Sequence, residues 1–270
     1  MTNRITIIGQ NSFLSQALQK QTPSNDWRYL SHKDALSETG WIDKTDTLIN
    51  CAFHPDLRTG AYSPIKDIDF MLAGYIQNRP IHYIMLSSRA VYGDAPKDLI
   101  LREDQPPAPI TPYAQNKYTS EQAVTDLLPP DRLTILRMGN IFGVERGRQT
   151  FFGQMLSGSL DHGIMRFNIA PDAVRDFLYA GQWARYMAKI ANAPKAGLYN
   201  IGAGFGITTE ELANWIIEIY GEGHAEYTGR SYEGQFILDT AKAASAYNLE
   251  PYTKEQLKKD CETVIHESVT

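Results

Sequence analysis

Tyrosine and lysine stand four residues apart at three places in this chain, and that spacing can serve proton transfer. The three pairs are Tyr29/Lys33, Tyr62/Lys66 and Tyr113/Lys117. On a helix, residues four apart lie on one face. The tyrosine hydroxyl has a reference pKa of about 10, and a neighbouring ammonium lowers it. Such a pair can exchange a proton with a carbonyl oxygen, provided that both residues lie on a helix.

The local sequence favours the third pair. The first pair spans a predicted strand end, and Pro64 interrupts the second pair and disfavours helix at the residue before it. Tyr113 follows Thr111-Pro112, which is a good helix start because proline is favoured in the first turn. We therefore predict Tyr113 and Lys117 as catalytic residues.

A serine lies upstream of this pair, at the end of the apolar run His82–Leu86. The run predicts a buried strand, and ligands of parallel sheets bind at the carboxyl ends of strands. Ser88 is therefore predicted as the third catalytic residue, with a hydroxyl that can bind the reacting carbonyl. The alternative is a serine that only caps a loop.

The elements that must position these residues follow from the hydrophobic pattern. Short apolar runs predict parallel strands at Ile5–Ile8, Thr47–Asn50, His82–Leu86, Leu133–Met138 and Gly197–Ile201. Helices are predicted at Ser12–Lys20, Ile65–Gln77, Asp176–Ile190 and Thr209–Tyr220, the last with a capping box of Thr208 and Glu211. The alternation predicts an α/β fold, a doubly wound parallel sheet of the Rossmann type.

The same pattern suggests two parts of the chain. We expect residues 1–143 and 171–201 to form a dinucleotide-binding domain, and residues 144–170 and 202–270 to form a small C-terminal substrate-binding subdomain. Residues 145–170 show no clear period and are interpreted as an excursion that faces the substrate. The glycine-rich stretch 202–206 is interpreted as a structural turn.

A glycine turn follows the first predicted strand. Gly9 stands where a dinucleotide-binding fold holds pyrophosphate against a helix N-terminus, but Ser12 and Ser15 replace the next two expected glycines. The alternative is a plain turn between strand and helix. The residues that we expect to contact the cofactor here are Gly9, Asn11, Ser12, Phe13 and Leu14.

The residues after the expected second strand bear on the choice of cofactor. An acidic residue about 20 positions beyond the first glycine would bind the ribose of NAD. Here the chain has Ser31, His32 and Lys33, a hydroxyl and a cation that favour the 2′-phosphate of NADP, although a polar loop is the alternative and NAD is not excluded. Cys51 and Ala52, after the third strand, are predicted to line the same cleft, or simply to pack around it.

Composition narrows the classes of function. The chain has 270 residues, 43% of them hydrophobic and 21% charged, and a net charge of -5, which gives no support for nucleic-acid binding. No apolar run reaches the roughly 18 residues that a membrane span needs. Two cysteines far apart fit a reducing cytoplasm, and the six histidines lack the spacing of a metal site. We expect a cytoplasmic protein with a small-molecule partner.

Five stretches in order resemble the extended short-chain dehydrogenase/reductase family of nucleotide-sugar epimerases, dehydratases and reductases. They are Ser87–Gly93, Thr111–Lys117, Leu136–Gly143, Arg175–Tyr179 and Tyr199–Gly202. The resemblance implies that Ser88 orients the substrate carbonyl and that Tyr113 exchanges the proton. It implies that Lys117 binds the nicotinamide ribose and lowers the pKa of Tyr113. Relatives often form homodimers through helices that include the Tyr/Lys helix, so a homodimer is compatible with the resemblance.

The resemblance also implies further binding residues. Those at the cofactor are Ser87, Tyr113, Lys117, Asn140 and Ile141, and those at the substrate are Ser88, Arg89, Asn140 and Arg175. Asn140 and Arg175 fall where relatives contact the nucleotide diphosphate. We add Arg146 and Arg148, because a diphosphate favours planar cationic donors, with a solvated loop as the alternative.

Departures from the family pattern narrow the expected chemistry. Dehydratases carry an acidic pair after the catalytic Ser or Thr, and relatives of fucose synthase carry a cysteine there, whereas this chain has Arg89-Ala90. What remains is simple hydride transfer or a 4-epimerisation, and a chain of 270 residues is closer in length to the 4-keto-sugar reductases of this family. The resemblance therefore favours reduction of a 4-keto-deoxy sugar on a nucleoside diphosphate, with NADP as the cofactor. The alternatives are a nucleotide-sugar epimerase with tightly bound NAD and a non-catalytic NADP-sensing regulator.

Overall fold

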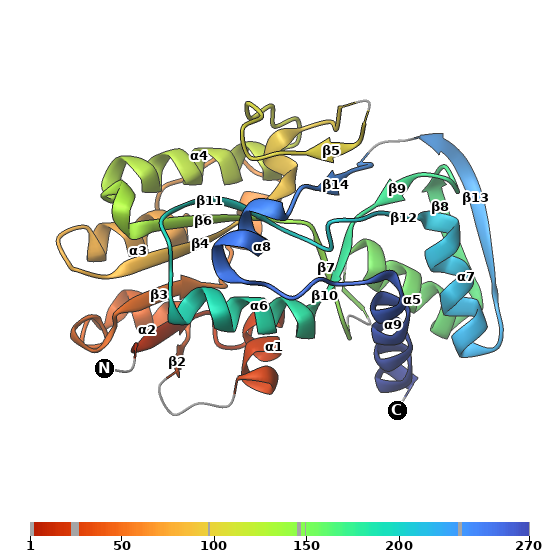
Figure 1. Cartoon of the computed structure of the whole chain (residues 1–270), viewed down its shortest axis with the longest axis horizontal. Helices are drawn as coiled ribbons and strands as arrows, with labels where there is room; N and C mark the ends of the chain where they lie inside the picture. Colours follow the sequence, from red (N-terminus) through yellow and green to blue (C-terminus); the bar gives the residue numbers. More distant parts are fainter. Residues whose placement is uncertain are drawn as a thin grey trace.

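A six-stranded parallel sheet forms the centre of the molecule (Figure 1). The computed structural model describes residues 3–22, 27–96, 98–144, 147–148, 150–231 and 234–269. In sheet order the strands are β2 (Trp27–Leu30), β1 (Ile5–Ile8), β3 (Thr47–Asn50), β4 (His82–Ser88), β6 (Leu133–Met138) and β11 (Gly197–Ile201). The predicted doubly wound α/β fold is confirmed, and β2, the strand expected before Ser31, lies at one edge of the sheet.

The strands are apolar because both faces of the sheet are covered. All four residues of β1 and all four of β3 are buried. Successive side chains of a strand point to opposite faces, so Ile7 and Ile49 pack in one core cluster and Ile8 and Leu48 in another. Continuous apolar runs are the expected sequence pattern of such strands.

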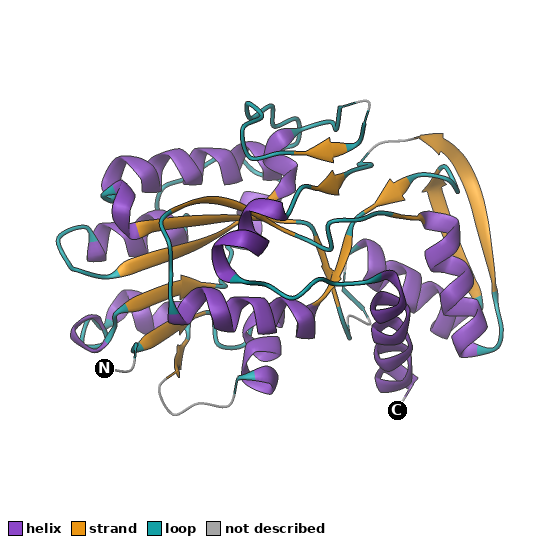
Figure 2. Ribbon diagram, in the orientation of Figure 1, coloured by secondary structure: helices purple, strands orange, loops and turns teal. Residues whose placement is uncertain are grey.

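Helices cover the two faces of the sheet, as Figure 2 shows in purple. Helices α1 (Phe13–Gln21) and α6 (Ala180–Asn192) pack together on one face. Helices α2 (His32–Ser37), α3 (Ile68–Ile76) and α4 (Pro112–Leu127) lie on the other, where α3 packs against both neighbours. Short 3₁₀ helices connect these elements at η1 (Ile42–Lys44), η2 (Pro55–Arg58), η3 (Arg89–Tyr92) and η4 (Pro130–Arg132).

A second group of elements gathers at one end of the sheet (Figure 1). Helix α5 (Phe151–His162), strand β8 (Ile164–Ile169), helix α7 (Thr209–Tyr220), strand β13 (His224–Ser231) and helix α9 (Lys254–Val269) build it. Helix α8 (Ala241–Tyr247) packs beside β11. The strands β7 (Asn140–Phe142) and β10 (Phe177–Tyr179), β9 (Val174–Arg175) and β12 (Ile207–Thr208), and β5 (Ile100–Leu101) and β14 (Ile237–Leu238) form three small pairs. The division of the chain into a dinucleotide-binding domain and a substrate-binding subdomain stays a prediction.

Three elements differ most from the sequence prediction. Helix α3 begins at Ile68 and not at Ile65, because Asp67 caps it by accepting from the amide of Phe70 at 3.1 Å. Helix α6 begins at Ala180, since the preceding residues form β10 and pair with β7. Residues 151–169 form α5 and β8 instead of an irregular excursion.

Two other local predictions are confirmed. Thr208 caps α7 by accepting from the amide of Glu211 at 3.0 Å. The stretch 202–206 is a turn in which the Asp176 carboxylate accepts from the amides of Ala203 and Gly204, at 2.7 and 3.1 Å. Within the described ranges, no helix is both long and apolar enough to cross a membrane.

Candidate active site

The strand order changes direction at β1, and a cleft opens there at the carboxyl ends of β1 and β3. After β1, the chain forms β2 on one side of β1. The later strands of the central sheet, β3, β4, β6 and β11, lie on the other side of β1. Gly9, the first residue after β1, has φ +90°, and a Cβ atom on it would lie 2.8 Å from the backbone nitrogen of Ala52. Only glycine therefore allows these two loops to approach. Open α/β sheets bind ligands at such a switch point.

Helix α1 points its N-terminus into this cleft. Ser12 caps the helix by accepting from the amide of Ser15 at 3.1 Å. The free amides of a first turn and the helix dipole suit an anion. The described part of the cleft, here called the inner cleft, has a volume of about 250 Å³. Of the predicted residues it is lined by Ser12, Phe13, Leu14, Cys51, Ala52, Ser87, Tyr113, Lys117 and Ile141.

The predicted catalytic helix begins as the sequence indicated. Thr111 caps α4 by accepting from the amide of Ala114 at 3.2 Å, and Pro112 occupies its first turn. Tyr113 and Lys117 therefore lie one helical turn apart. The Lys117 ammonium is buried, donates to the carbonyl oxygen of Leu86 at 2.9 Å and lies 3.5 Å from a carboxylate oxygen of Asp69.

Ser88 and Tyr113 line a second hollow of about 400 Å³, here called the outer cavity. Ser88 ends β4, and its hydroxyl accepts from the amide of Ala90 at 3.2 Å, so it caps η3 as well as facing the cavity. The capping role that the sequence left open is therefore real, and it does not remove Ser88 from the site. Tyr113 belongs to the walls of both the inner cleft and the outer cavity.

Phe53 and Arg58 complete the surroundings of Tyr113, and the sequence did not single out Arg58. The rings of Phe53 and Tyr113 meet edge to face with centroids 5.5 Å apart. The Arg58 guanidinium carbon lies 5.5 Å from the Tyr113 centroid. Arg58 ends η2, the first helical turn after β3. A search of every cation that closely follows a predicted strand would have found it.

The outer cavity also contains an amide group that suggests a ligand. The Asn140 side-chain nitrogen is buried and has no hydrogen-bond partner in the part of the chain that the structure describes. Leaving a buried donor unsatisfied is costly. A bound acceptor would satisfy this amide, which agrees with the predicted contact to substrate.

Arg89 and Arg175 converge beside this cavity. A Cβ atom on Gly234 would lie 3.1 Å from one terminal nitrogen of Arg175 and 3.3 Å from one of Arg89. The Arg89 guanidinium stacks on Phe236, and that of Arg175 on Phe151, each at 4.3 Å. Burial and the charge of Arg175 lower the pKa of Arg89 to about 10. Two guanidinium groups that share one space form a favourable position for an anion.

The remaining predicted contacts lie around the inner cleft but not on its described wall. Gly9 and Asn11 belong to the turn itself. Ser31, at the start of α2, caps that helix by accepting from the amide of Asp34 at 3.1 Å, and His32 and Lys33 form its first turn. They follow β2, whose last carbonyl accepts from the amide of Gly9 at 2.8 Å. Their contact with a 2′-phosphate stays a prediction.

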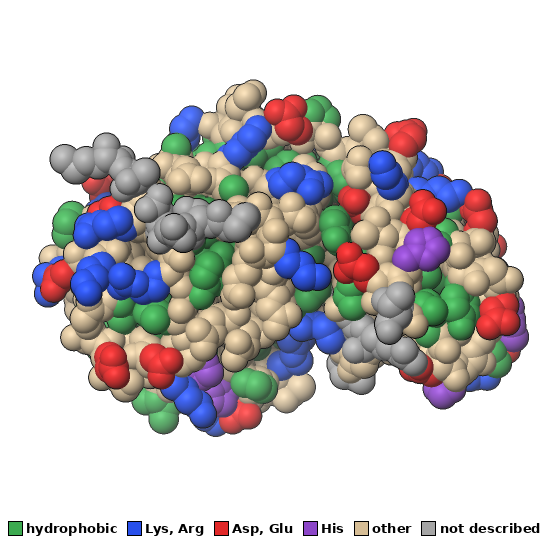
Figure 3. Space-filling model, turned by 90° about the horizontal axis from the view of Figure 1, so that it is seen from below, with side chains coloured by type: hydrophobic (Ala, Val, Ile, Leu, Met, Phe, Trp, Pro, Cys, Tyr) green, Lys and Arg blue, Asp and Glu red, His purple; other side chains and the backbone are tan. Residues whose placement is uncertain are grey.

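Of the two arginines added on charge alone, Arg148 lies near α1. The Arg148 guanidinium carbon lies 4.7 Å from the ring centroid of Phe13, and Arg148 lines the inner cleft. This places it beside the glycine turn instead of beside Arg175. Arg146 lies outside the described residues. Seen from below, the surface is hollowed between the two ends of the molecule, with Lys and Arg side chains beside the hollow (Figure 3).

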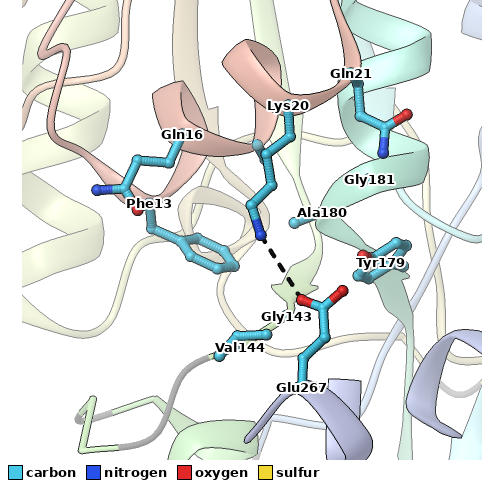
Figure 4. Close-up of a pocket in the computed structure, with 11 residues that line it drawn as sticks. Phe13, Gln16, Lys20, Gln21, Gly143, Val144, Tyr179, Ala180, Gly181 and Glu267 are labelled. Carbon is cyan, nitrogen blue, oxygen red and sulfur yellow. Dashed lines mark ion pairs between the residues drawn. The ribbon is translucent and has the colours of Figure 1, made fainter. Parts of the chain in front are cut away.

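A smaller hollow behind Phe13 does not belong to this site (Figure 4). Its volume is about 90 Å³, well below that of common ligand pockets. Lys20 of α1 and Glu267 of α9 form an ion pair across it at 3.7 Å. The pair joins the C-terminal helix to α1. Elsewhere in the described ranges, no group of three or more His, Cys, Asp or Glu could hold a metal ion.

The fold and this cleft define a dinucleotide-binding type of enzyme, and comparison with known proteins identifies the family. The model of the NAD dependent epimerase/dehydratase family matches residues 9–202, so the chain belongs to this family. The predicted family resemblance is therefore confirmed. The match includes the turn at Gly9, the Tyr113/Lys117 helix and the strand β11.

Several solved structures share the fold over nearly their whole length. UDP-N-acetylglucosamine 4-epimerase from Methanobrevibacter ruminantium M1, in complex with UDP-N-acetylmuramic acid, is 17% identical, with TM-score 0.81 and 98% of each chain covered. MoeE5 in complex with UDP-glucose and NAD is 18% identical, with TM-score 0.78 and 98% of each chain covered. RMD from Pseudomonas aeruginosa, complexed with NADPH, is 18% identical, with TM-score 0.79, covering 99% of this chain and 98% of that chain. At such identities these likenesses show the fold alone.

Proposed function

We propose that this protein is an NADPH-dependent reductase of a 4-keto-deoxy sugar carried on a nucleoside diphosphate. The observation that carries the proposal is the position of Tyr113, which belongs to the walls of the inner cleft and of the outer cavity. A proton donor between a cofactor and a carbonyl substrate must face both. Ser88 and Asn140 face the outer cavity from the β4 and β7 sides.

The inner cleft fits a nicotinamide dinucleotide. The close approach at Gly9, the N-terminus of α1 and the guanidinium of Arg148 offer donors for a pyrophosphate. Ser31, His32 and Lys33 follow β2 and offer a hydroxyl and a cation that would suit a 2′-phosphate, which supports NADP. RMD, which shares the fold, was solved with NADPH, and MoeE5 with NAD. NADP is therefore the cofactor that we propose, with NAD as the alternative.

The chain's own residues then provide the acid for carbonyl reduction. A bound reduced nicotinamide would supply a hydride to the carbonyl carbon. Ser88 donates a hydrogen bond to the carbonyl oxygen, and Tyr113 gives that oxygen its proton as the carbon–oxygen double bond becomes a single bond. The Lys117 ammonium stabilises the phenolate that remains, and solvent returns the proton to Tyr113. The product is the 4-hydroxy sugar and the oxidised cofactor.

Arg89, Arg175 and Asn140 are the proposed substrate contacts. A diphosphate offers the planar, bidentate acceptors that guanidinium groups bind well. The two arginines approach one another beside the outer cavity, and Asn140 contributes a buried donor. No carboxylate directly follows Ser88 in the sequence, so elimination of water from the sugar lacks the proton carriers that dehydratases use.

An epimerase is the second candidate, because the likeness to a UDP-sugar 4-epimerase spans nearly both whole chains. In that case the hydride leaves the sugar and returns to its other face, with no net use of reduced cofactor. Titration calorimetry with NADPH and NADH, together with a spectrum for bound nicotinamide, separates the two. Binding of NADPH to a cofactor-free protein, followed by loss of absorbance at the nicotinamide band with a nucleotide 4-keto sugar, supports the reductase. Tightly retained NAD and interconversion of sugars without oxidation of NADPH would favour the epimerase.

A further inference from the structure

A buried carboxylate, that of Asp69, lies beside Lys117 and has no role in the proposed proton transfer. Asp69 belongs to α3, is 3% exposed, and approaches the Lys117 ammonium with one oxygen at 3.5 Å. Its other oxygen accepts from the side-chain amide of Asn50 at 2.8 Å and from the hydroxyl of Tyr83 at 2.6 Å. A carboxylate that accepts such bonds is favoured in its charged form. Three neighbouring elements thus hold Asp69 in place.

These contacts determine the directions in which the three N–H donors of Lys117 point. A lysine ammonium carries three N–H donors. Lys117 gives one to the carbonyl oxygen of Leu86 at 2.9 Å, and Asp69 faces a second. The Lys117 side chain also lines the inner cleft, with its nitrogen 4.9 Å from the Phe53 centroid. One donor is therefore left for the cleft, in a direction set by the other two.

We propose that Asp69 is a positioning residue, whose carboxylate keeps the buried Lys117 charged and directs its remaining donor into the inner cleft. The proposal rests on the proposed function for its effect on turnover, but the contact between the two residues can be tested without turnover. A buried lysine in the same place without Asp69 would lose its nearest opposite charge, and buried lysines with weaker compensation lose their proton more readily.

The charges around the pair agree with this role. Burial alone lowers the pKa of Lys117, but Asp69, Tyr113 and Asp67 outweigh it and raise that pKa. Burial raises the pKa of Asp69 above its ordinary value, and the charge of Asp67 adds to that rise. The charge of Lys117 and the bonds from Tyr83 and Asn50 offset only part of it. The ammonium therefore stays charged over the physiological range.

Asp67 provides a matched control from the same helix start. It is buried, caps α3 and accepts from the hydroxyl of Tyr62 at 2.8 Å and from that of Ser120. It forms no ion pair with Lys117 among the described residues. Asp67→Asn and Asp69→Asn remove the same charge two positions apart, and asparagine remains a good helix cap.

The experiment compares the alkaline limb of the pH–rate profile for NADPH-dependent reduction in wild type, Asp69→Asn and Asp67→Asn. We expect the limb to move down by about 1–2 pH units in Asp69→Asn and by clearly less in Asp67→Asn, because only Asp69 faces the ammonium directly. The titration of Lys117 itself is followed by NMR of ¹³Cε-labelled lysine, with Lys117→Arg to assign the signal. Its midpoint should fall in Asp69→Asn by a similar amount.

The outcomes separate the two proposals. A lower Lys117 midpoint in a protein that reduces no keto sugar would support the positioning role and overturn the proposed reductase. Two results would overturn the positioning role. One is normal turnover in Asp69→Asn with an unchanged alkaline limb and an unchanged Lys117 midpoint. The other is an equal shift in Asp69→Asn and Asp67→Asn. If Asp69→Asn does not fold, Tyr83→Phe removes one donor to Asp69 and should move the acid limb up, since that donor lowers the pKa of Asp69. An unmoved acid limb there would also overturn the role.

Discussion

Buried cations have different electrostatic surroundings on the inner-cleft side and on the outer-cavity side of Tyr113. On the inner side, Lys117 lies 3.5 Å from Asp69, and Arg137 of β6 donates to both oxygens of Glu121 at 3.0 and 2.6 Å. On the outer side, the charge with the largest effect on Arg89 is that of Arg175. No ion pair joins Arg89 to a carboxylate of the described residues.

The inner cations are paired with carboxylates of the protein, whereas the charge with the largest effect on Arg89 is another cation. A buried ion pair is satisfied by its own geometry and holds its elements in register, although it adds little net stability over an apolar pair. Two like charges that lie close together repel one another, and an anion bound between them would reduce that repulsion. We therefore propose that the inner side holds Lys117 in place for catalysis and that the outer side binds the negative charge of the substrate.

The largest expected effect comes from substituting Tyr113, which lines both the inner cleft and the outer cavity. Tyr113→Phe removes the proton donor without changing the ring that contacts Phe53, so turnover should fall by about 10²- to 10⁴-fold. The affinity for NADPH, measured by calorimetry, should stay as in wild type. Full activity in this variant would contradict the proposed role of Tyr113 and leave the comparison without its dividing residue.

A second test breaks an inner pair. Glu121→Gln leaves Arg137 buried at 3% exposure without its carboxylate, and Ser87 loses its charged acceptor. Breaking a buried pair costs about 3–5 kcal/mol, which urea unfolding should show as a lower midpoint. The double variant Glu121→Gln with Arg137→Met removes both charges and should recover part of that loss. Equal stability of Glu121→Gln and wild type would show that the inner pair is not needed.

A third test removes an outer charge. Arg89→Met keeps much of the side-chain volume over Phe236 and removes the repulsion with Arg175, so stability should be unchanged or higher. The KM for the nucleotide sugar should rise about 10- to 100-fold, as expected for one lost hydrogen bond between charged groups. Lys20→Met serves as a control, because Lys20 is also a cation but pairs with Glu267 away from the site. An unchanged KM in Arg89→Met would remove Arg89 from the substrate contacts.

The sequence predicted those parts of the site that depend on neighbouring residues in the chain. The central strands are mostly apolar because both faces of the sheet are covered, and Thr111 and Pro112 marked the start of the Tyr113/Lys117 helix. The motifs around Ser88 and Asn140 were recognisable because each is a contiguous stretch. These residues were predicted together, and the structure places Ser88, Tyr113 and Asn140 on one cavity.

The parts that were missed depend on contacts between distant segments. Nothing in the sequence near Asp69 connects it to Lys117, since only the packing of α3 against α4 brings them together. Helix α5 was missed because its sequence, with glycines at 153 and 158, has weak helix propensity, and burial against β8 outweighs that weakness. The expected helix at 176–190 was too long because pairing of β10 with β7 cannot be seen from the local pattern.

The smallest expected effect comes from an exposed pair, which measures how much burial matters to the comparison. Arg4 donates to both carboxylate oxygens of Asp46, at 3.0 and 2.7 Å, and its hydrogen bonds lower the pKa of Asp46 to about 2. A depressed carboxyl pKa stabilises the folded state above the ordinary value of 3.8, and that contribution disappears as the pH falls through about 2. Because solvent screens the pair, Asp46→Asn should lower the free energy of unfolding by less than about 1 kcal/mol at neutral pH. The difference from wild type should shrink toward pH 2. A loss as large as that of Glu121→Gln would show that burial is not what makes the inner pairs important.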